Sequence, residues 1–331
     1  MKKVLAIVML LVLTFASAVT VSAAQVETIE HVWVDENGTA LADGEYPDIA
    51  LDFDLRVASA RDNTHTEYGV TESLPNITIT KPVGSNKICI DGIENLKGAG
   101  YFTYEFTAAD PNVAGVNVST DTYAVEILRT FVMADGKATE EVETKSIAFY
   151  EIQDEARVKV DTISSTFVTS DLAIDKAVTG NLAYKDDRFT VELTFSFDGE
   201  IKTDIVLPDS TVVAFDEGSS TATATIEISD NDGVMTVTDI PAGVNVTVNE
   251  TDPGDYELVG YSVDGADSTK EAPTITASAE DASVVITNDY STEIDMGVTL
   301  DSLPYVLILL TVGGAAVFYF IKMRRNALEA E

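Results

Sequence analysis

A lysine, a glutamate and an asparagine in the second half of the sequence are the residues best suited to chemistry. Lys176 stands in Leu-Ala-Ile-Asp-Lys-Ala-Val-Thr-Gly, Glu250 in Val-Thr-Val-Asn-Glu-Thr-Asp-Pro-Gly-Asp-Tyr, and Asn288 in Val-Val-Ile-Thr-Asn-Asp-Tyr. A lysine amine attacks only when it is neutral, and burial lowers its pKa. A buried carboxyl group can stay protonated, so it can polarise a carboxamide and carry a proton. The alternative is an exposed Lys176–Glu250 ion pair, with Asn288 at a strand end.

The elements that must position these residues are predicted to be β-strands. Hydrophobic residues alternate with polar or small ones over residues 49–57, 189–197 and 244–248, which is the period of a strand with one buried face. Asn-Gly and Asp-Gly pairs recur between such runs and indicate tight turns. Outside the two ends we find no long segment with helical periodicity. The pattern predicts an all-β protein with two tandem immunoglobulin-like β-sandwich domains.

The two ends of the chain predict secretion and membrane anchoring. Residues 1–24 have a basic start, an apolar run and small residues at the exit, as a secretory signal peptide does. Residues 303–321 carry no charge, and as a helix they would span roughly 28 Å, close to the thickness of a hydrocarbon core. The basic tail, 322–331, would hold that end in the cytoplasm. We therefore expect a cell-surface protein whose C-terminal helix has the membrane as its partner and whose preceding domains are extracellular.

Composition limits the classes of function. The formal net charge of −36 argues against a nucleic-acid partner, because the phosphates would be repelled. Cys89 is the one cysteine, so no intramolecular disulfide can form, and its place between two isoleucines predicts a buried side chain. Asp230-Asn-Asp-Gly resembles part of a calcium loop, but the full pattern is absent and a hairpin turn is favoured. We expect no metal and no other cofactor.

Taken in order, the three segments around Lys176, Glu250 and Asn288 resemble the isopeptide-linkage domains of Gram-positive pilins, such as the streptococcal backbone pilin. That family has a Lys-x-Val-x-Gly first strand and an Ile-Thr-Phe-Thr-Asn closing strand. Its middle motif is similar to the stretch from Thr-Asp-Ile-Pro-Ala-Gly, residues 238–243, to Glu250. The resemblance implies a pilin-type sandwich over residues 169–290, in which Lys176 and Asn288 form an amide bond with Glu250 as the catalyst. Such a reaction is internal and occurs once, so it implies no enzyme acting on other molecules.

The preceding part of the chain resembles the N-terminal domain of the same pilins through residues 100–107 and 115–125. The reactive residues of the family are missing there. Ala108 stands in place of the glutamate, the first strand around His31 has no lysine, and the closing strand around Ser165 has no asparagine. We therefore predict a pilin-like sandwich without the crosslink over residues 25–168. A Ser/Thr-rich stretch, 162–171, marks the expected boundary.

Residues 291–302 are expected to link the second sandwich to the membrane helix, and they carry a degenerate sorting motif. Asp295, Met296 and Gly297 stand where the family often has Pro-Thr-Gly, so only the glycine remains. This departure favours retention in the membrane over attachment to the cell wall, although an unusual sortase stays an alternative partner. Lys159 lies near the place of the family's polymer-forming lysine. A solvated surface lysine is the favoured interpretation of Lys159.

The leading hypothesis is a structural cell-surface protein, a pilin-like stalk or a pilus subunit that has other pilin subunits as partners. The alternative is a membrane-anchored adhesin that does not polymerise and recognises a host or cell-surface ligand, with aromatic residues such as Trp33, Tyr101, Phe102 and Tyr104 near its site. A secreted hydrolase is disfavoured, because two histidines and one cysteine form no nucleophile triad or zinc pattern. We expect no enzyme beyond the autocatalytic crosslink.

Overall fold

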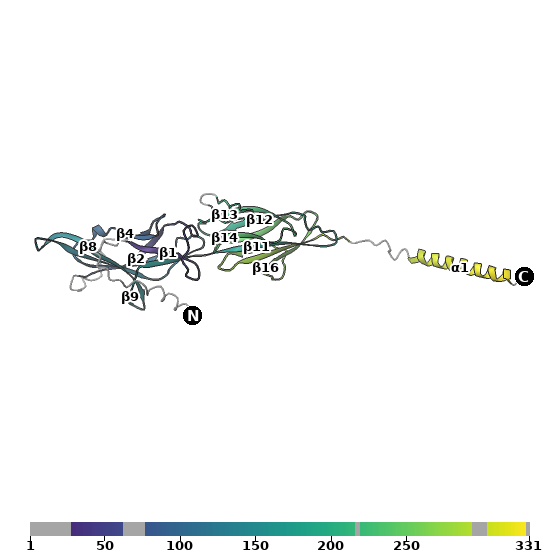
Figure 1. Ribbon diagram of the computed structural model, residues 1–331, viewed down its shortest axis with the longest axis horizontal. Helices are drawn as coiled ribbons and strands as arrows, with labels where there is room; N and C mark the ends of the chain where they lie inside the picture. The colour runs from purple at the N-terminus through teal and green to yellow at the C-terminus, as the bar shows by residue number, and fades with distance from the viewer. Residues whose placement is uncertain (1–27, 62–76, 216–218, 293–302, 329–331) are drawn as a thin grey trace.

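The computed structural model describes residues 28–61, 77–215, 219–292 and 303–328 (Figure 1). Two β-rich regions lie end to end, and the helix α1 (Leu303–Leu328) lies beyond them at the far end of the molecule. We call residues 28–168 the N-terminal region and residues 169–292 the C-terminal region. The predicted all-β fold with a C-terminal apolar helix is confirmed. The residue boundaries that we expected for the domains stay predictions.

The N-terminal region is one ten-stranded sheet in the order β6-β10-β1-β4-β3-β2-β5-β7-β8-β9. The first strand, β1, pairs in parallel with the last, β10, and β2 pairs with β3 at its start and with β5 along the rest. Side chains from both halves of this sheet, such as Trp33 on β1 and Ile127 on β7, share one hydrophobic core. The strands are β1 (Thr28–Val34), β2 (Leu51–Arg61), β3 (Thr78–Lys81), β4 (Lys87–Asp91), β5 (Gly100–Ala108), β6 (Val116–Val118), β7 (Tyr123–Ala134), β8 (Lys137–Gln153), β9 (Ala156–Val160) and β10 (Thr162–Phe167).

The C-terminal region is a sandwich of two four-stranded sheets, β14-β11-β18-β16 and β13-β12-β15-β17. Its first strand, β11, again lies parallel to its last, β18, while the other sheet is antiparallel. Residues such as Ile174, Leu193 and Ile286 alternate inward and form the second core. The strands are β11 (Thr169–Thr179), β12 (Phe189–Ser196), β13 (Thr221–Ile228), β14 (Met235–Pro241), β15 (Asn245–Asp252), β16 (Glu257–Val263), β17 (Thr274–Thr276) and β18 (Ala282–Asp289).

The two regions meet at a hydrogen-bonded junction rather than through a loose linker. β10 ends at Phe167 and β11 begins at Thr169, so the Ser/Thr-rich boundary stretch is strand almost throughout. The Gly115 N–H donates to the Ala242 carbonyl at 2.9 Å, and the Val168 N–H donates to the Gly115 carbonyl at 3.0 Å. Ala114 packs with the core of the C-terminal region. A loop of the N-terminal region therefore completes the packing of its neighbour.

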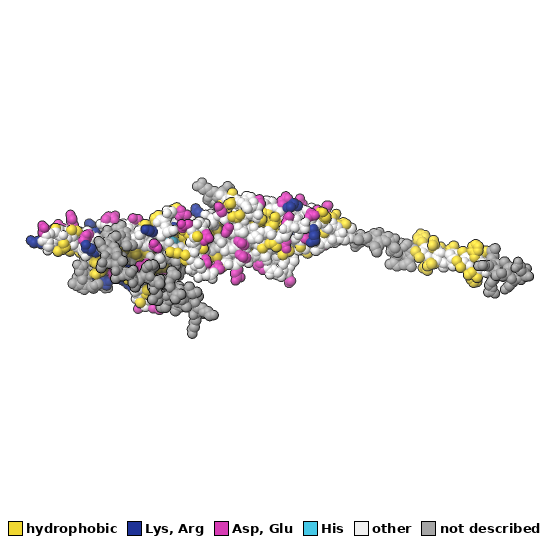
Figure 2. Space-filling view, in the orientation of Figure 1, with side chains coloured by type: hydrophobic (Ala, Val, Ile, Leu, Met, Phe, Trp, Pro, Cys, Tyr) yellow, Lys and Arg dark blue, Asp and Glu magenta, His cyan; other side chains and the backbone are white. Residues whose placement is uncertain are grey.

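The surface of the β-rich regions and the surface of α1 differ in character. Acidic side chains spread over the visible face of both β-rich regions, and apolar side chains cover α1 (Figure 2). Within α1, Tyr305–Lys322 is long and apolar enough to cross a membrane, and none of it is buried against the protein. The helix continues past residue 321, where we expected it to end. The predicted signal peptide, residues 1–24, and the predicted remnant of a sorting motif, Asp295, Met296 and Gly297, lie outside the described residues.

The prediction that the Cys89 side chain is buried is wrong. Its neighbours Ile88 and Ile90 are buried, whereas Cys89 itself is only partly buried. Successive side chains of a strand point to opposite faces, so a residue between two core residues faces away from that core. The thiol therefore is not part of the hydrophobic interior.

Candidate functional site: a buried lysine, glutamate and asparagine

The C-terminal region brings together the three residues that the sequence singled out. Lys176 lies on β11 and Asn288 on β18, and these strands are parallel neighbours. Their register pairs Lys176 with Ile286 and Val178 with Asn288, so the two polar side chains are two positions apart on the same face of the sheet. Glu250 comes from β15 in the opposite sheet. The cluster therefore lies between the two layers of the sandwich.

The glutamate contacts both of the other groups. The Lys176 amine donates to Glu250 Oε2 at 3.3 Å, and the Asn288 amide nitrogen donates to Glu250 Oε1 at 2.7 Å. Each carboxylate oxygen thus serves a different partner, which holds the amine and the carboxamide at one carboxyl group. Asn288 Oδ1 has no hydrogen-bond partner among the described residues.

The cluster is shielded from water. The side chains of Lys176 and Glu250 are 0% and 1% exposed, and Asn288 is fully buried. The centroid of the Phe189 ring lies 4.1 Å from Lys176 Nζ, so the ring covers the amine without accepting a conventional hydrogen bond. Burial lowers the pKa of Lys176 to about 8, although attraction to Glu250 opposes the shift. A far larger fraction of the amine is therefore neutral near pH 7.5 than for an exposed lysine.

Tyr261 supports the glutamate, and sequence reasoning missed it. This residue of β16 is buried, and its hydroxyl accepts a hydrogen bond of 2.9 Å from the Glu250 N–H. The contact ties the backbone of β15 at Glu250 to the opposite layer of the sandwich, since β15 and β16 belong to different sheets. A tyrosine on a strand is ordinarily a core residue, so no feature of the sequence distinguishes this one.

The arrangement is suited to the formation of an amide bond. Transfer of one proton within the Lys176–Glu250 pair produces a neutral amine beside a carboxylic acid. The amine could then attack the Asn288 carboxamide carbon, and the acid could give its proton to the amide nitrogen, whose bond to that carbon breaks as it leaves as ammonia. The Glu250 carboxylate could then take the second proton from the attacking lysine nitrogen, which becomes the N–H of the new amide. Contact between the groups replaces a collision in solution, and this raises their effective concentration. No cofactor is needed for this reaction.

The N-terminal region holds a different pair at the corresponding strand positions. Its parallel strands β1 and β10 pair His31 with Ile163 and Trp33 with Ser165, which repeats the two-residue offset of Lys176 and Asn288. His31 Nε2 and Ser165 Oγ are 3.0 Å apart and hydrogen-bonded, and both residues are buried. A histidine and a serine therefore stand where a crosslink would need a lysine and an asparagine.

Other candidate residues are separate from this cluster. Lys159 lies on the edge strand β9 with its side chain 67% exposed, 3.9 Å from Asp161. Trp33, Phe102 and Tyr104 are buried in the N-terminal core, so these aromatic residues do not form an exposed binding surface.

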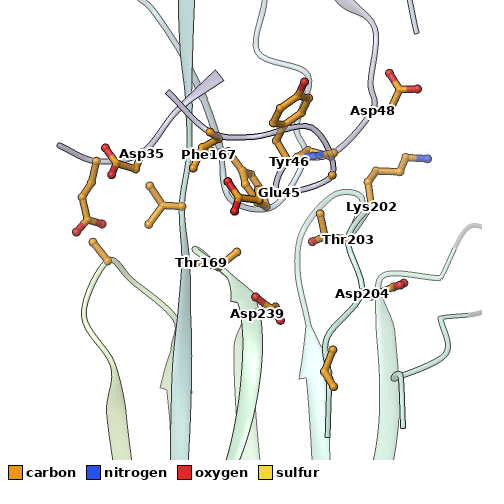
Figure 3. Close-up of a pocket in the computed structure, with 17 residues that line it drawn as sticks. Asp35, Glu45, Tyr46, Asp48, Phe167, Thr169, Lys202, Thr203, Asp204 and Asp239 are labelled. Carbon is orange, nitrogen blue, oxygen red and sulfur yellow. The ribbon is translucent and has the colours of Figure 1, made fainter. Parts of the chain in front are cut away.

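A pocket of about 720 Å³ lies where the two regions meet (Figure 3). Tyr46 and several carboxylates, Asp35, Glu45 and Asp239 among them, line it together with Lys202. Lys176, Glu250 and Asn288 do not line this pocket. The cluster is thus enclosed between the sheets, away from this pocket.

Comparisons with known proteins cover most of the chain. Residues 170–290 match the model of a family described only as a domain of unknown function (DUF7601). No curated protein matches. The major pilin protein T3.2 of Streptococcus pyogenes is 16% identical with a TM-score of 0.54, and the match covers 81% of this chain and 99% of the pilin. A second major pilin of that organism is 18% identical, with a TM-score of 0.52 and coverages of 80% and 98%. The chain therefore has the fold of the streptococcal major pilins, over nearly their whole length.

Proposed function

We propose that this chain is a pilin-like structural protein of the cell surface, anchored in the membrane by α1, whose C-terminal region joins Lys176 to Asn288 through an amide bond. The observation that carries the proposal is the buried contact of one carboxyl group with both an amine and a carboxamide. The fold shared with the streptococcal major pilins supports it. The protein would act as an extracellular stalk and would not turn over a substrate.

The bond would make the stalk resistant to unfolding. It would tie the first strand of the C-terminal region to its last, and enclose more than a hundred residues between Lys176 and Asn288. Because the crosslink is an amide, it would resist the reducing agents that break a disulfide. A chain with a single cysteine cannot close such a loop with an intramolecular disulfide.

Mass spectrometry of the purified full chain tests the crosslink. Trypsin should leave the Lys176 and Asn288 peptides joined, with a combined mass lower by one ammonia, about 17 Da from the stoichiometry of the condensation. Glu250→Ala should abolish the joined species. Glu257→Ala should retain it, because Glu257 is an exposed residue of β16 that pairs with Lys270. Separate, unmodified peptides in the wild-type digest would refute the bond.

Assembly into a pilus is the second part of the proposal. Lys159 is exposed on an edge strand, so its amine is accessible to a transpeptidating sortase and another subunit. The degenerate sorting motif favours a protein that instead remains in the membrane as a single stalk or adhesin. Denaturing gels of cell-wall and membrane fractions separate the two outcomes. A ladder that disappears in Lys159→Arg supports polymerisation, and a single band in the membrane fraction contradicts it.

A further inference from the structure

The buried cluster around His31 in the N-terminal region has no role in the proposed crosslink. His31 is 3% exposed, and its Nε2 bonds to Ser165 Oγ across the parallel strands β1 and β10. Its other ring nitrogen, Nδ1, has no hydrogen-bond partner among the described residues. The Trp33 ring packs edge-on against the imidazole, with 5.0 Å between the ring centroids. The imidazole is therefore held at one nitrogen and enclosed at the other.

The charged groups around His31 disfavour protonation of its imidazole ring. Lys81 of β3 is 1% exposed, its amine donates to the Ile49 carbonyl at 2.9 Å, and its electrostatic effect on His31 is unfavourable to protonation. The group of β10 that bonds to His31 is the Ser165 hydroxyl. Glu30 and Lys87, which pair across β1 and β4, are both exposed. The Asp48 carboxylate favours the protonated form of Lys81 and so opposes the lowering of the Lys81 pKa by burial. No carboxylate of the described residues forms an ion pair with His31.

We propose that the His31–Ser165 hydrogen bond is a reversible, acid-sensitive latch between β1 and β10, at the strand positions where the C-terminal region holds Lys176 and Asn288. In the neutral ring one nitrogen bonds to Ser165, and the ring fits an apolar site. A protonated ring has N–H groups on both nitrogens, and the one at Nδ1 would have no acceptor in this site. The N-terminal region would then release its first strand in acid, while the C-terminal region would stay closed.

The direction of the pH response follows from linkage. Burial, with a smaller effect of Lys81, lowers the pKa of His31 from 6.5 to about 4. The unfolded chain therefore binds the proton first as the pH falls, and protonation favours unfolding. The stabilising effect of the neutral ring is complete above about pH 6.5 and is lost as the pH falls through 4. Between pH 7.5 and 4.5, the equilibrium constant for unfolding of this region should rise roughly 70-fold through His31 alone.

The single tryptophan gives a selective measurement of this region. Trp33 is the one tryptophan of the chain and lies against His31, so its fluorescence follows unfolding of the N-terminal region in the full chain in detergent micelles. Urea titrations at pH 7.5 and 4.5 should show the acid-induced loss in the wild type and in His65→Gln. They should show little of it in His31→Gln, whose side chain does not titrate. An equal loss in the wild type and in His31→Gln would overturn the latch.

Two further measurements test the latch without the His31→Gln variant. Histidine NMR of the folded wild-type chain, assigned with His65→Gln, should give His31 a pKa well below 6.5. A pKa at or above 6.5 would overturn the proposal. Ser165→Ala should unfold at lower urea concentration at pH 7.5 and still weaken in acid. An unchanged urea midpoint in Ser165→Ala would overturn the role of the hydrogen bond.

Discussion

The two β-rich regions each join their first strand to their last in parallel, and each places a pair of polar residues across that join. In the C-terminal region the pair is Lys176 and Asn288, and a glutamate contacts both. In the N-terminal region the pair is His31 and Ser165, which bond directly to each other. The same strand geometry can therefore hold a reactive set or a simple hydrogen bond, and the side chains present decide between them.

Each region also buries one lysine among its described residues, and the two environments differ. Lys176 faces Glu250, whereas the Lys81 amine donates to a backbone carbonyl. Burial lowers the pKa of both lysines. A buried amine is thus common to the two regions. Lys176 is distinguished by the Glu250 carboxyl group, which contacts both this amine and the Asn288 carboxamide.

The largest expected effect is the loss of the crosslink. Glu250→Ala should prevent the bond, which by the loop-entropy argument stabilises by about 4–5 kcal/mol for a closed loop of this length. The substitution also leaves Lys176 buried without its charge partner, which costs about 3 kcal/mol more. Calorimetry of the full chain should show a large decrease in the melting temperature of the C-terminal region. Glu257→Ala is the control, and an equal decrease in both variants would contradict a special role for Glu250.

Transplanting the reactive pair tests whether strand position is sufficient. The double variant His31→Lys, Ser165→Asn should form no bond, because neither His31 nor Ser165 bonds to a carboxylate among the described residues. It should destabilise the N-terminal region by about 3 kcal/mol, because a buried lysine would lack a charge partner. Digestion and mass spectrometry check for the bond, and Trp33 fluorescence measures the stability. Loss of ammonia from the double variant would show that the carboxyl group is dispensable.

A substitution at the junction tests whether the two regions unfold independently. At Gly115, φ is 78° and an added Cβ would lie 2.6 Å from the Phe167 ring, whereas at Gly136, with φ of 74°, nothing lies within 4 Å. Gly115→Ala should therefore cost about 2 kcal/mol, compared with about 1 kcal/mol for Gly136→Ala, where only the backbone conformation is unfavourable. Calorimetry should show a change in both transitions for Gly115→Ala. A change confined to the N-terminal transition would mean that the regions unfold independently.

The smallest expected effect concerns the second buried lysine. Lys81→Met removes a buried amine and leaves the Ile49 carbonyl without its donor, so these opposing effects should leave stability at neutral pH within about 1 kcal/mol of the wild type. The pKa of His31 should rise part of the way toward 6.5, because burial remains the larger cause of its shift. Histidine NMR measures this change. A further decrease in the pKa of His31 would contradict the repulsion from Lys81.

Local sequence patterns were enough to predict the strand-rich fold, the apolar terminal helix and the three residues of the cluster. Hydrophobic alternation is a local property, and the segments around Lys176, Glu250 and Asn288 carry short motifs that can be recognised one at a time. The sequence also indicated that the N-terminal region lacks a lysine on its first strand and an asparagine on its closing strand.

Which side chains meet depends on the tertiary structure. The equivalence of His31 and Ser165 to Lys176 and Asn288 depends on the register of two parallel strands more than a hundred residues apart, which no local pattern encodes. The burial of Lys81, the support of Glu250 by Tyr261 and the outward face of Cys89 depend in the same way on which strands become neighbours. Long-range pairing sets these contacts because a strand specifies two faces but not its partner.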